Sequence, residues 1–391
     1  MAGPGMPTAS PGSATCLRAL RFGSVAPGNP EVESVKVTVV PGAELTPEHV
    51  TRWSAIHLAN PSLASPYFAP EFVQVTASAR DDVRVSILED DAGVVGFFPF
   101  QGGSDGPAHP VAGRMSDFHG IIASDALTWD APTLLRSSGL SGWRFDHLLA
   151  SQEPLRRFHW TEAPSPYIDL ADGFEAYRQQ RKDAGSREIE QILYKARKAE
   201  RRLGPLRFEF QASDEAPFAA LLRWKAQQYR ATGQQDITAI PWIVRFLDRI
   251  RHARGERFSG LMSALYIGDR LAAVHFGMRS STVLHYWFPA YDPELAFFSP
   301  GQLCIIELAR AAASQGVRRI DLGKGEEAYK SRLMSGSTPV AEGAVDLRPL
   351  VGTAGRRWFQ LRNWARRSPL RRPLLVPARW LRRTAAARSK H

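Results

Sequence analysis

The sequence predicts an α+β protein with mixed, mostly antiparallel sheets flanked by helices. Three observations indicate this class. Helical and strand-like segments are interspersed in the second half, three consecutive strands there are separated by tight turns, and one further strand follows a helix. A hairpin pattern also recurs in the two halves, at 85–101 and 263–279, as apolar strand, acidic–glycine turn and apolar strand. We therefore expect two similarly built halves.

Length and composition set the domain organisation. The 391 residues are enough for two domains plus tails, and the 44% hydrophobic content is enough for real cores. No run approaches the ~18 apolar residues that a membrane span needs. We predict four segments, namely a disordered leader (1–33), an N-terminal domain (34–165), a C-terminal domain (166–350) and a basic amphipathic tail (351–391).

The first half shows few clear elements. Residues 35–40 are rich in β-branched residues and predict a strand. Residues 46–60 begin with a Thr cap and an early acid, which predicts a helix. Residues 83–101 predict a hairpin, and the stretch that follows is mixed and Gly-rich. Residues 161–170 predict an extended connector between the halves.

The second half is easier to assign. Helices are predicted at 173–204, with a break at 184–185, and at 214–233, 240–255 and 299–315. Strands are predicted at 206–211, as three strands within 260–292, and at 317–322. The helix at 299–315 is apolar nearly all round, so we expect it to pack against the sheet and to lead to one added strand.

Charge is concentrated at the C-terminus. The net charge is +11, yet residues 356–391 alone hold eleven Arg, one Lys and no acid, which leaves 38 basic and 39 acidic residues elsewhere. Trp358, Phe359, Trp364 and Trp380 lie in the same segment. A basic segment with tryptophans suits an anionic membrane surface. A solvated tail without a partner is the main alternative, and nucleic acid is the less favoured partner.

Cysteine and histidine usage indicates a reducing, metal-free setting. Cys16 lies in the leader and Cys304 in an apolar helix, so no disulfide is expected, which favours a cytoplasmic protein. No Cys/His cluster has the sequence spacing of metal ligands, so no metal is predicted.

Three consecutive motifs resemble a known family. They are IGDRLAAVHFG (267–277), YWFPAYDPELAFFSPGQL (286–303) and GVRRIDLGKGEEAYKSRL (316–333). The last contains D-x-G-x-G-x-E-x-Y-K. In order and spacing these motifs resemble the CelD-like (cellulose biosynthesis) acetyltransferases of the GNAT superfamily, and the likeness extends less distinctively over about 67–333. The layout is also similar to the Fem aminoacyl transferases, which have two GNAT-like halves and a lysine at the corresponding final position.

The resemblance implies two GNAT-like halves and an acyltransferase. The expected donor is acetyl-CoA or another acyl-CoA, and the expected acceptor is a saccharide or cell-envelope precursor, as in exopolysaccharide biosynthesis. A Fem-like enzyme that uses aminoacyl-tRNA is the alternative, although no long heptad arm occurs in this sequence. A non-catalytic polysaccharide-assembly protein is the third hypothesis. The expected location is cytoplasmic, with peripheral membrane contact through the tail.

A donor site is predicted around Ser299, Gly301 and Gln302. An acyl-CoA enzyme must hold a pyrophosphate, and the unpaired N–H groups at a helix start do this well. Ser299 supplies a cap-type residue, and Gly301 permits close approach. Gly323 and Gly325 follow the next strand and are assigned to the same donor site. An ordinary turn before a buried helix is the alternative interpretation.

The catalytic candidates are Lys330, Asp321 and His275. Lys330 can stabilise the oxyanion or a donor phosphate, or it is merely exposed on a short helix. Asp321 can accept the acceptor's proton, or it caps the helix that starts near residue 326. His275 occupies a strand position at which this family tends to carry histidine, but a lone strand histidine is more often a core residue.

The remaining candidates form a predicted substrate wall. Aromatic side chains stack on sugars or pantetheine, whereas in strands they are usually core residues. The candidates for acceptor binding are Tyr286, Trp287, Tyr291, Lys225, Tyr229 and Tyr329.

Overall fold

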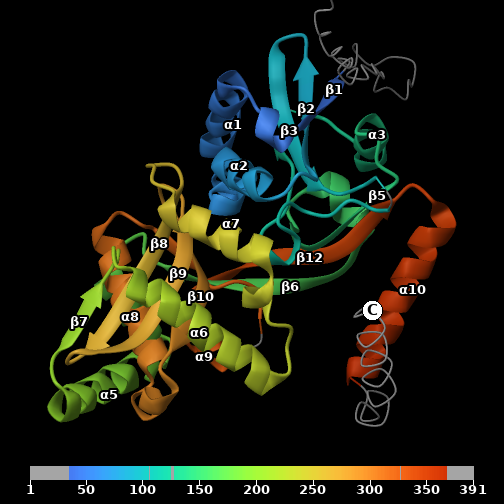
Figure 1. Ribbon diagram of the computed structural model, residues 1–391. Coiled ribbons are helices and arrows are strands. Elements are labelled where there is room, and N and C mark those ends of the chain that lie inside the picture. Colours follow the sequence, from blue (N-terminus) through green and yellow to red (C-terminus); the bar gives the residue numbers. More distant parts are fainter. Residues whose placement is uncertain (1–34, 105, 125–126, 326, 368–391) are drawn as a thin grey trace, which may run out of the picture.

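The computed structural model describes residues 35–104, 106–124, 127–325 and 327–367, and it has the expected α+β fold (Figure 1). Two sheets, mostly antiparallel, lie at its centre. The predicted leader and residues 368–391 of the predicted tail, with Trp380, lie outside the described residues.

The smaller sheet belongs to the first half. It has the order β1-β2-β3-β4, formed by Lys36–Pro41, Val83–Asp90, Gly93–Gln101 and Ile122–Ala123. The predicted strand and hairpin are therefore confirmed. Helix α1 (Pro47–Ala59) is also confirmed, since Thr46 Oγ1 accepts a hydrogen bond from the His49 amide at 3.3 Å. Helices α2 (Pro70–Ala79) and α3 (Ala131–Ser137) complete this half, and the sequence analysis did not predict them.

The larger sheet has the order β5-β12-β6-β11-β10-β9-β8-β7. Its strands in chain order are β5 (Gly142–Leu149), β6 (His159–Asp169), β7 (Leu206–Glu209), β8 (Ser259–Ile267), β9 (Arg270–Arg279), β10 (Val283–Tyr291), β11 (Arg319–Asp321) and β12 (Gly336–Asp346). The three predicted consecutive strands are confirmed as β8, β9 and β10. Strand β11 pairs parallel to β10, as expected of a strand added after a helical crossover.

The segment predicted as a connector at 161–170 belongs to a sheet strand. It lies within β6, which pairs with β11 on one side and with β12 on the other. Figure 1 shows β6 and β12 as two long strands side by side that run towards β5. No sequence pattern predicted β5 or β12, or the joining of a strand from each half into one sheet.

Helices cover both faces of β8, β9 and β10 (Figure 1). The predicted break in the first helix is confirmed, because α4 spans Phe174–Asp183 and α5 spans Glu188–Leu203. The other helices are α6 (Glu215–Thr232), α7 (Pro241–His252), α8 (Pro300–Ser314), α9 (Ala328–Leu333) and α10 (Pro349–Arg367). Phe218 of α6 and Phe246 of α7 pack on one face, and Leu303 of α8 packs on the other.

Helix α10 contains the described part of the basic tail. Its Phe359 ring lies 5.2 Å from the Trp160 ring, and Arg362 pairs with Glu342 of β12 at 3.0 Å. The helix therefore packs against the sheet by one side. Among the described residues, no helix combines the length and apolar character required to cross a bilayer.

Candidate functional site

A cavity of about 540 Å³ lies between β10, α6 and the starts of α8 and α9, and we call it the central cavity. Eight of the predicted site residues line it, and they come from four separate elements. They are Lys225, Tyr286, Trp287, Tyr291, Gly301, Gln302, Tyr329 and Lys330. Six others are not among the lining residues: Ser299, Tyr229, His275, Asp321, Gly323 and Gly325.

The start of α8 forms one wall of the central cavity. Ser299 has a left-handed backbone (φ 54°, ψ 50°), and its side chain makes no capping hydrogen bond. The predicted side-chain cap is therefore wrong, and Ser299 Oγ instead accepts a hydrogen bond from Lys195 Nζ at 2.8 Å. Gly301 lies against the ring of Tyr291, because an added Cβ would come within 3.2 Å of Cδ1. The Gln302 amide group donates to Glu188 at 3.1 Å.

Lys330 presents a buried ammonium group at the opposite wall. Its Nζ donates to the Gly323 carbonyl at 3.2 Å and lies 3.1 Å from Glu327 Oε2. The side chain is only 9% exposed, so the alternative of an exposed lysine does not apply. The Lys330 ammonium group is thus desolvated and held in place by a carbonyl and a carboxylate, so it places a positive charge beside the cavity.

The two glycines of the Gly-Lys-Gly motif permit this packing. An added Cβ on Gly325 would lie 2.7 Å from Lys330 Nζ, and one on Gly323 would lie 3.0 Å from Asp117 Oδ2. Gly323 also has a φ of 72°, which a side chain disfavours. Both glycines therefore allow charged side chains to approach the backbone closely.

A second buried lysine lies on α6. Lys225 Nζ donates to Gln228 Oε1 at 3.1 Å, and the residue is 9% exposed. Burial lowers the pKa of Lys225 to about 8, and the nearby charge of Glu327 only partly opposes this shift. The ammonium group therefore loses its proton more readily than a surface lysine does. Tyr229, one turn later, is not among the lining residues.

Asp321 and His275 are fully buried in the sheet. Asp321 lies 2.9 Å from the Arg319 guanidinium, and burial raises its pKa although that charge opposes the shift. The next helix, α9, begins at Ala328 after Glu327, so Asp321 does not cap it. His275 stacks on Tyr286 with ring centroids 4.6 Å apart, and burial lowers its pKa to about 3.

Asp117 is the main lining residue that the sequence analysis missed. It comes from the loop before β4 in the first half, and its Oδ2 lies 2.9 Å from Nε2 of His285 on β10. Burial acts to raise the Asp117 pKa, but the hydrogen bond and charge of His285, with His147 and Lys330, hold it below the usual range. Its surroundings in the sequence carry no motif, so only the fold could reveal it.

The central cavity therefore combines three chemical features. A helix start with amide N–H groups suits an anion, two buried lysines supply positive charge, and the Asp117 carboxylate supplies a hydrogen-bond acceptor. Together they can hold an anionic donor, stabilise negative charge on a carbonyl oxygen and accept a hydrogen bond from an incoming amine or hydroxyl.

Comparisons with known proteins agree with this geometry. Residues 186–331 match the family described as "Acetyltransferase (GNAT) domain", and this range contains every lining residue of the central cavity except Asp117. No curated protein sequence matches the chain significantly.

Two solved structures share the fold over most of the chain. FemX is 10% identical, with a TM-score of 0.53 over 77% of this chain and 97% of its own. The C-terminal DUF2156 domain of a putative lysylphosphatidylglycerol synthetase from Agrobacterium fabrum is 13% identical, with a TM-score of 0.50 over 81% of this chain and 96% of its own. At these identities the likeness concerns the fold alone. Residues 186–331, which are less than half of the chain, are therefore similar to the GNAT acetyltransferase domain family.

Proposed function

We propose that the protein is an acyltransferase that takes an acyl-CoA donor in the central cavity and acylates an amine or hydroxyl of a saccharide or cell-envelope precursor. One observation supports this most directly: the lining of the cavity, inside the matched domain, combines the start of α8 with two buried lysines. Its volume of about 540 Å³ also falls within the ~300–1,000 Å³ typical of small-molecule sites.

In this proposal the donor's pyrophosphate lies at the start of α8. The first amide groups of a helix have no intrahelical acceptor, and they lie at the positive end of its dipole. Gly301 leaves the approach to these amides open, apart from the ring of Tyr291. The pantetheine arm and acyl group then extend along Tyr286 and Trp287, which line the same cavity.

The chemical step is a direct acyl transfer. The acceptor nitrogen or oxygen attacks the thioester carbonyl, the carbon–sulfur bond breaks, and CoA leaves as its thiolate. Lys330 stabilises the oxygen on which negative charge develops. The acceptor's proton passes to Asp117, whose carboxylate lines the cavity. Asp321 and His275 are fully buried and do not line the central cavity, so this proposal gives them no contact with the substrates.

Calorimetry with CoA, acetyl-CoA and longer acyl-CoAs tests the donor assignment. We expect saturable binding to the full-length protein, and weaker binding by Gly301→Val because the new side chain blocks the helix start. Ala311→Val on the same helix, which does not line the cavity, is the matched control. Equal CoA affinity in a folded Gly301→Val protein would place the pyrophosphate elsewhere.

The similarity to the FemX fold favours one second candidate, a transferase that uses aminoacyl-tRNA. A charged tRNA would then be consumed in the presence of the acceptor, whereas acyl-CoA would not bind. A non-catalytic accessory protein would bind neither donor. The same calorimetric series, extended to charged tRNA, separates the three functions.

We also propose that α10 contacts an anionic membrane surface. Its packed side holds Phe359 and Arg362, whereas Trp358 and Trp364 are 66% and 59% exposed. Leu361 is also exposed, and the sequence of the helix contains no acidic residue. Exposed tryptophans beside arginines are typical of segments that bind at the headgroup level.

A further inference from the structure

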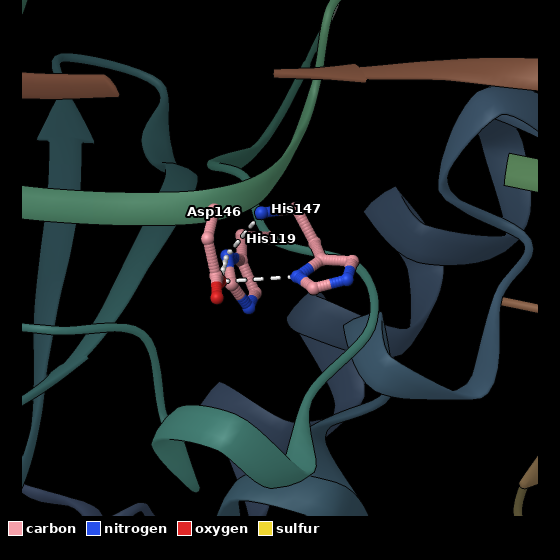
Figure 2. A group of neighbouring side chains, drawn as sticks. All are labelled: His119, Asp146 and His147. Carbon is pink, nitrogen blue, oxygen red and sulfur yellow. Dashed lines mark hydrogen bonds and ion pairs between the residues drawn. The ribbon is translucent and has the colours of Figure 1, made fainter. Parts of the chain in front are cut away.

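Two histidines and an aspartate form a compact cluster, with Asp146 and His147 on β5 and His119 in the loop before β4 (Figure 2). His147 Nδ1 lies 3.0 Å from Asp146 Oδ1, and His119 Nδ1 lies 3.7 Å from the same oxygen. The three candidate ligand atoms all lie within 4.8 Å of one another. No Cys/His cluster has the sequence spacing of metal ligands, so the sequence predicts no metal. The fold brings the three residues together.

A β-bulge in β5 explains how the side chains of the consecutive residues Asp146 and His147 both reach the cluster. Neighbouring side chains of a regular strand point to opposite faces. Here the register of β5 against β12 shifts, so that Asp146 and His147 together oppose the single residue Glu342. Bulges of this kind redirect side chains and often lie beside functional sites.

The outer nitrogen of each imidazole faces an oxygen. His119 Nε2 lies 3.0 Å from the Ser116 carbonyl, which assigns the proton to that nitrogen and leaves Nδ1 as an acceptor, which receives the His147 amide at 3.3 Å. His147 Nε2 lies 3.7 Å from Asp117 Oδ1, and its Nδ1 faces Asp146 Oδ1 at 3.0 Å without the geometry of a hydrogen bond. Metal-ligating histidines commonly have the outer N–H held by a carbonyl or carboxylate, and His119 shows this arrangement, whereas His147 faces its carboxylate beyond hydrogen-bond distance.

The spacing also suits a metal of the zinc type. Ligand distances of about 2.0–2.2 Å in a tetrahedral site place ligand atoms roughly 3.3–3.6 Å apart. The distances of 3.0 and 3.7 Å from Asp146 Oδ1 fall on either side of that range, so small side-chain rotations suffice. Two imidazoles and one carboxylate, with a further position open, are a common zinc ligand set.

The cluster is enclosed on one side and accessible on the other. The His119 side chain is 1% exposed, whereas that of Asp146 is 48% exposed and lines a second cavity of about 480 Å³. Two local interactions oppose a cation. The Lys324 ammonium donates to the Asp146 carbonyl, and the His147 amide donates to His119 Nδ1 at 3.3 Å. The hydrogen bond of Lys324 leaves the carboxylate oxygens free, although its charge also acts on that carboxylate, and the second contact is long for a hydrogen bond.

We propose that His119, Asp146 and His147 bind one divalent cation of the zinc type. The ion would hold His147 in place, and His147 faces Asp117 of the central cavity. The metal therefore acts as a positioning element for that carboxylate. The proposal does not depend on the identity of the acyl donor, because it concerns binding alone.

A cobalt titration of the full-length, chelator-treated protein tests the site. We expect one equivalent of Co²⁺ to give the visible ligand-field absorption of a four- or five-coordinate ion, and Zn²⁺ to displace it. His119→Gln, His147→Gln and Asp146→Asn should each weaken binding at least tenfold. His252→Gln is the matched control, since the His252 side chain is 59% exposed, lies 3.6 Å from Asp248 and belongs to no group of three metal-ligand candidates among the described residues.

An X-ray absorption spectrum of the zinc-loaded native protein provides a measurement that needs no variant. It should show only nitrogen and oxygen ligands, with the multiple scattering of two imidazoles. Absence of saturable binding at one equivalent would overturn the proposal. So would a spectrum without imidazole scattering, or folded variants that bind cobalt as the native protein does.

Discussion

Asp117 and His285 are 168 residues apart in the chain, yet the carboxylate lies 2.9 Å from the imidazole Nε2. His285 is fully buried on β10, whereas the Asp117 side chain is a quarter exposed and reaches the central cavity. The contact therefore links a loop of the first half to the strand that forms the cavity wall in the second half.

Removal of this contact should lower stability. Asp117→Ala leaves a buried imidazole N–H without its acceptor, so we expect the free energy of unfolding to fall by about 1–3 kcal/mol. Chemical denaturation measures the change. Asp91→Ala, in the exposed turn between β2 and β3, is the control and should be within about 0.5 kcal/mol of the native protein. An unchanged midpoint for Asp117→Ala would show that the contact contributes nothing.

Lys330→Ala should reduce turnover by about 10²–10³-fold, which is the usual cost of losing one donor to an oxyanion. Helix α9 should remain folded, because alanine favours helices. The measurement is the initial rate of CoA release with the native acceptor. Lys182→Ala, on the exposed end of α4, is the control. Retention of near-native turnover would remove Lys330 from the mechanism.

Lys225 should react with amine reagents at lower pH than surface lysines do. Its pKa of about 8 lies below the ordinary 10.5, so half of the side chains are neutral near pH 8. Mass spectrometry of acylated peptides across pH measures this, with Lys36, which is 49% exposed, as the reference. Identical pH profiles for the two lysines would contradict the expectation.

The lowered pKa of Lys225 also makes the stability of the protein depend on pH. Between about pH 8 and 10.5 the unfolded chain holds more protons at Lys225 than the folded chain does. The contribution of this group to the free energy of unfolding therefore rises with pH over that window. Lys225→Met should remove this rise, which denaturation at several pH values in the window would detect.

The surface of α10 should determine membrane binding. We expect the full-length protein to sediment with anionic but not neutral vesicles, and added salt to weaken the association. Trp358→Ala with Trp364→Ala should reduce sedimentation while Phe359 keeps the helix packed. Phe297→Ala, another exposed aromatic residue, is the control. Undiminished sedimentation of the double variant would exclude this face of α10.

The sequence best predicted those residues of the central cavity that lie together in one segment of the chain, 299–333. Gly301, Tyr329 and Lys330 lie in recognisable motifs, and all three line the central cavity. Asp117 and His119 come instead from the loop before β4, and Asp146 and His147 come from the bulge of β5, which no sequence period reveals. Residues 161–170 look like an extended connector in the sequence and contain Pro164 and Pro166, yet they lie within β6, which pairs on both sides.

Strand β12 lies between β5 and β6, although it is the last strand of the described chain. During synthesis on the ribosome, β5 and β6 therefore emerge long before the segment that separates them. Until residues 336–346 are available, both strands present unpaired edges that favour association with other chains. The larger sheet therefore cannot close between β5 and β6 until residues 336–346 have been synthesised, and these edges are exposed to other chains until then.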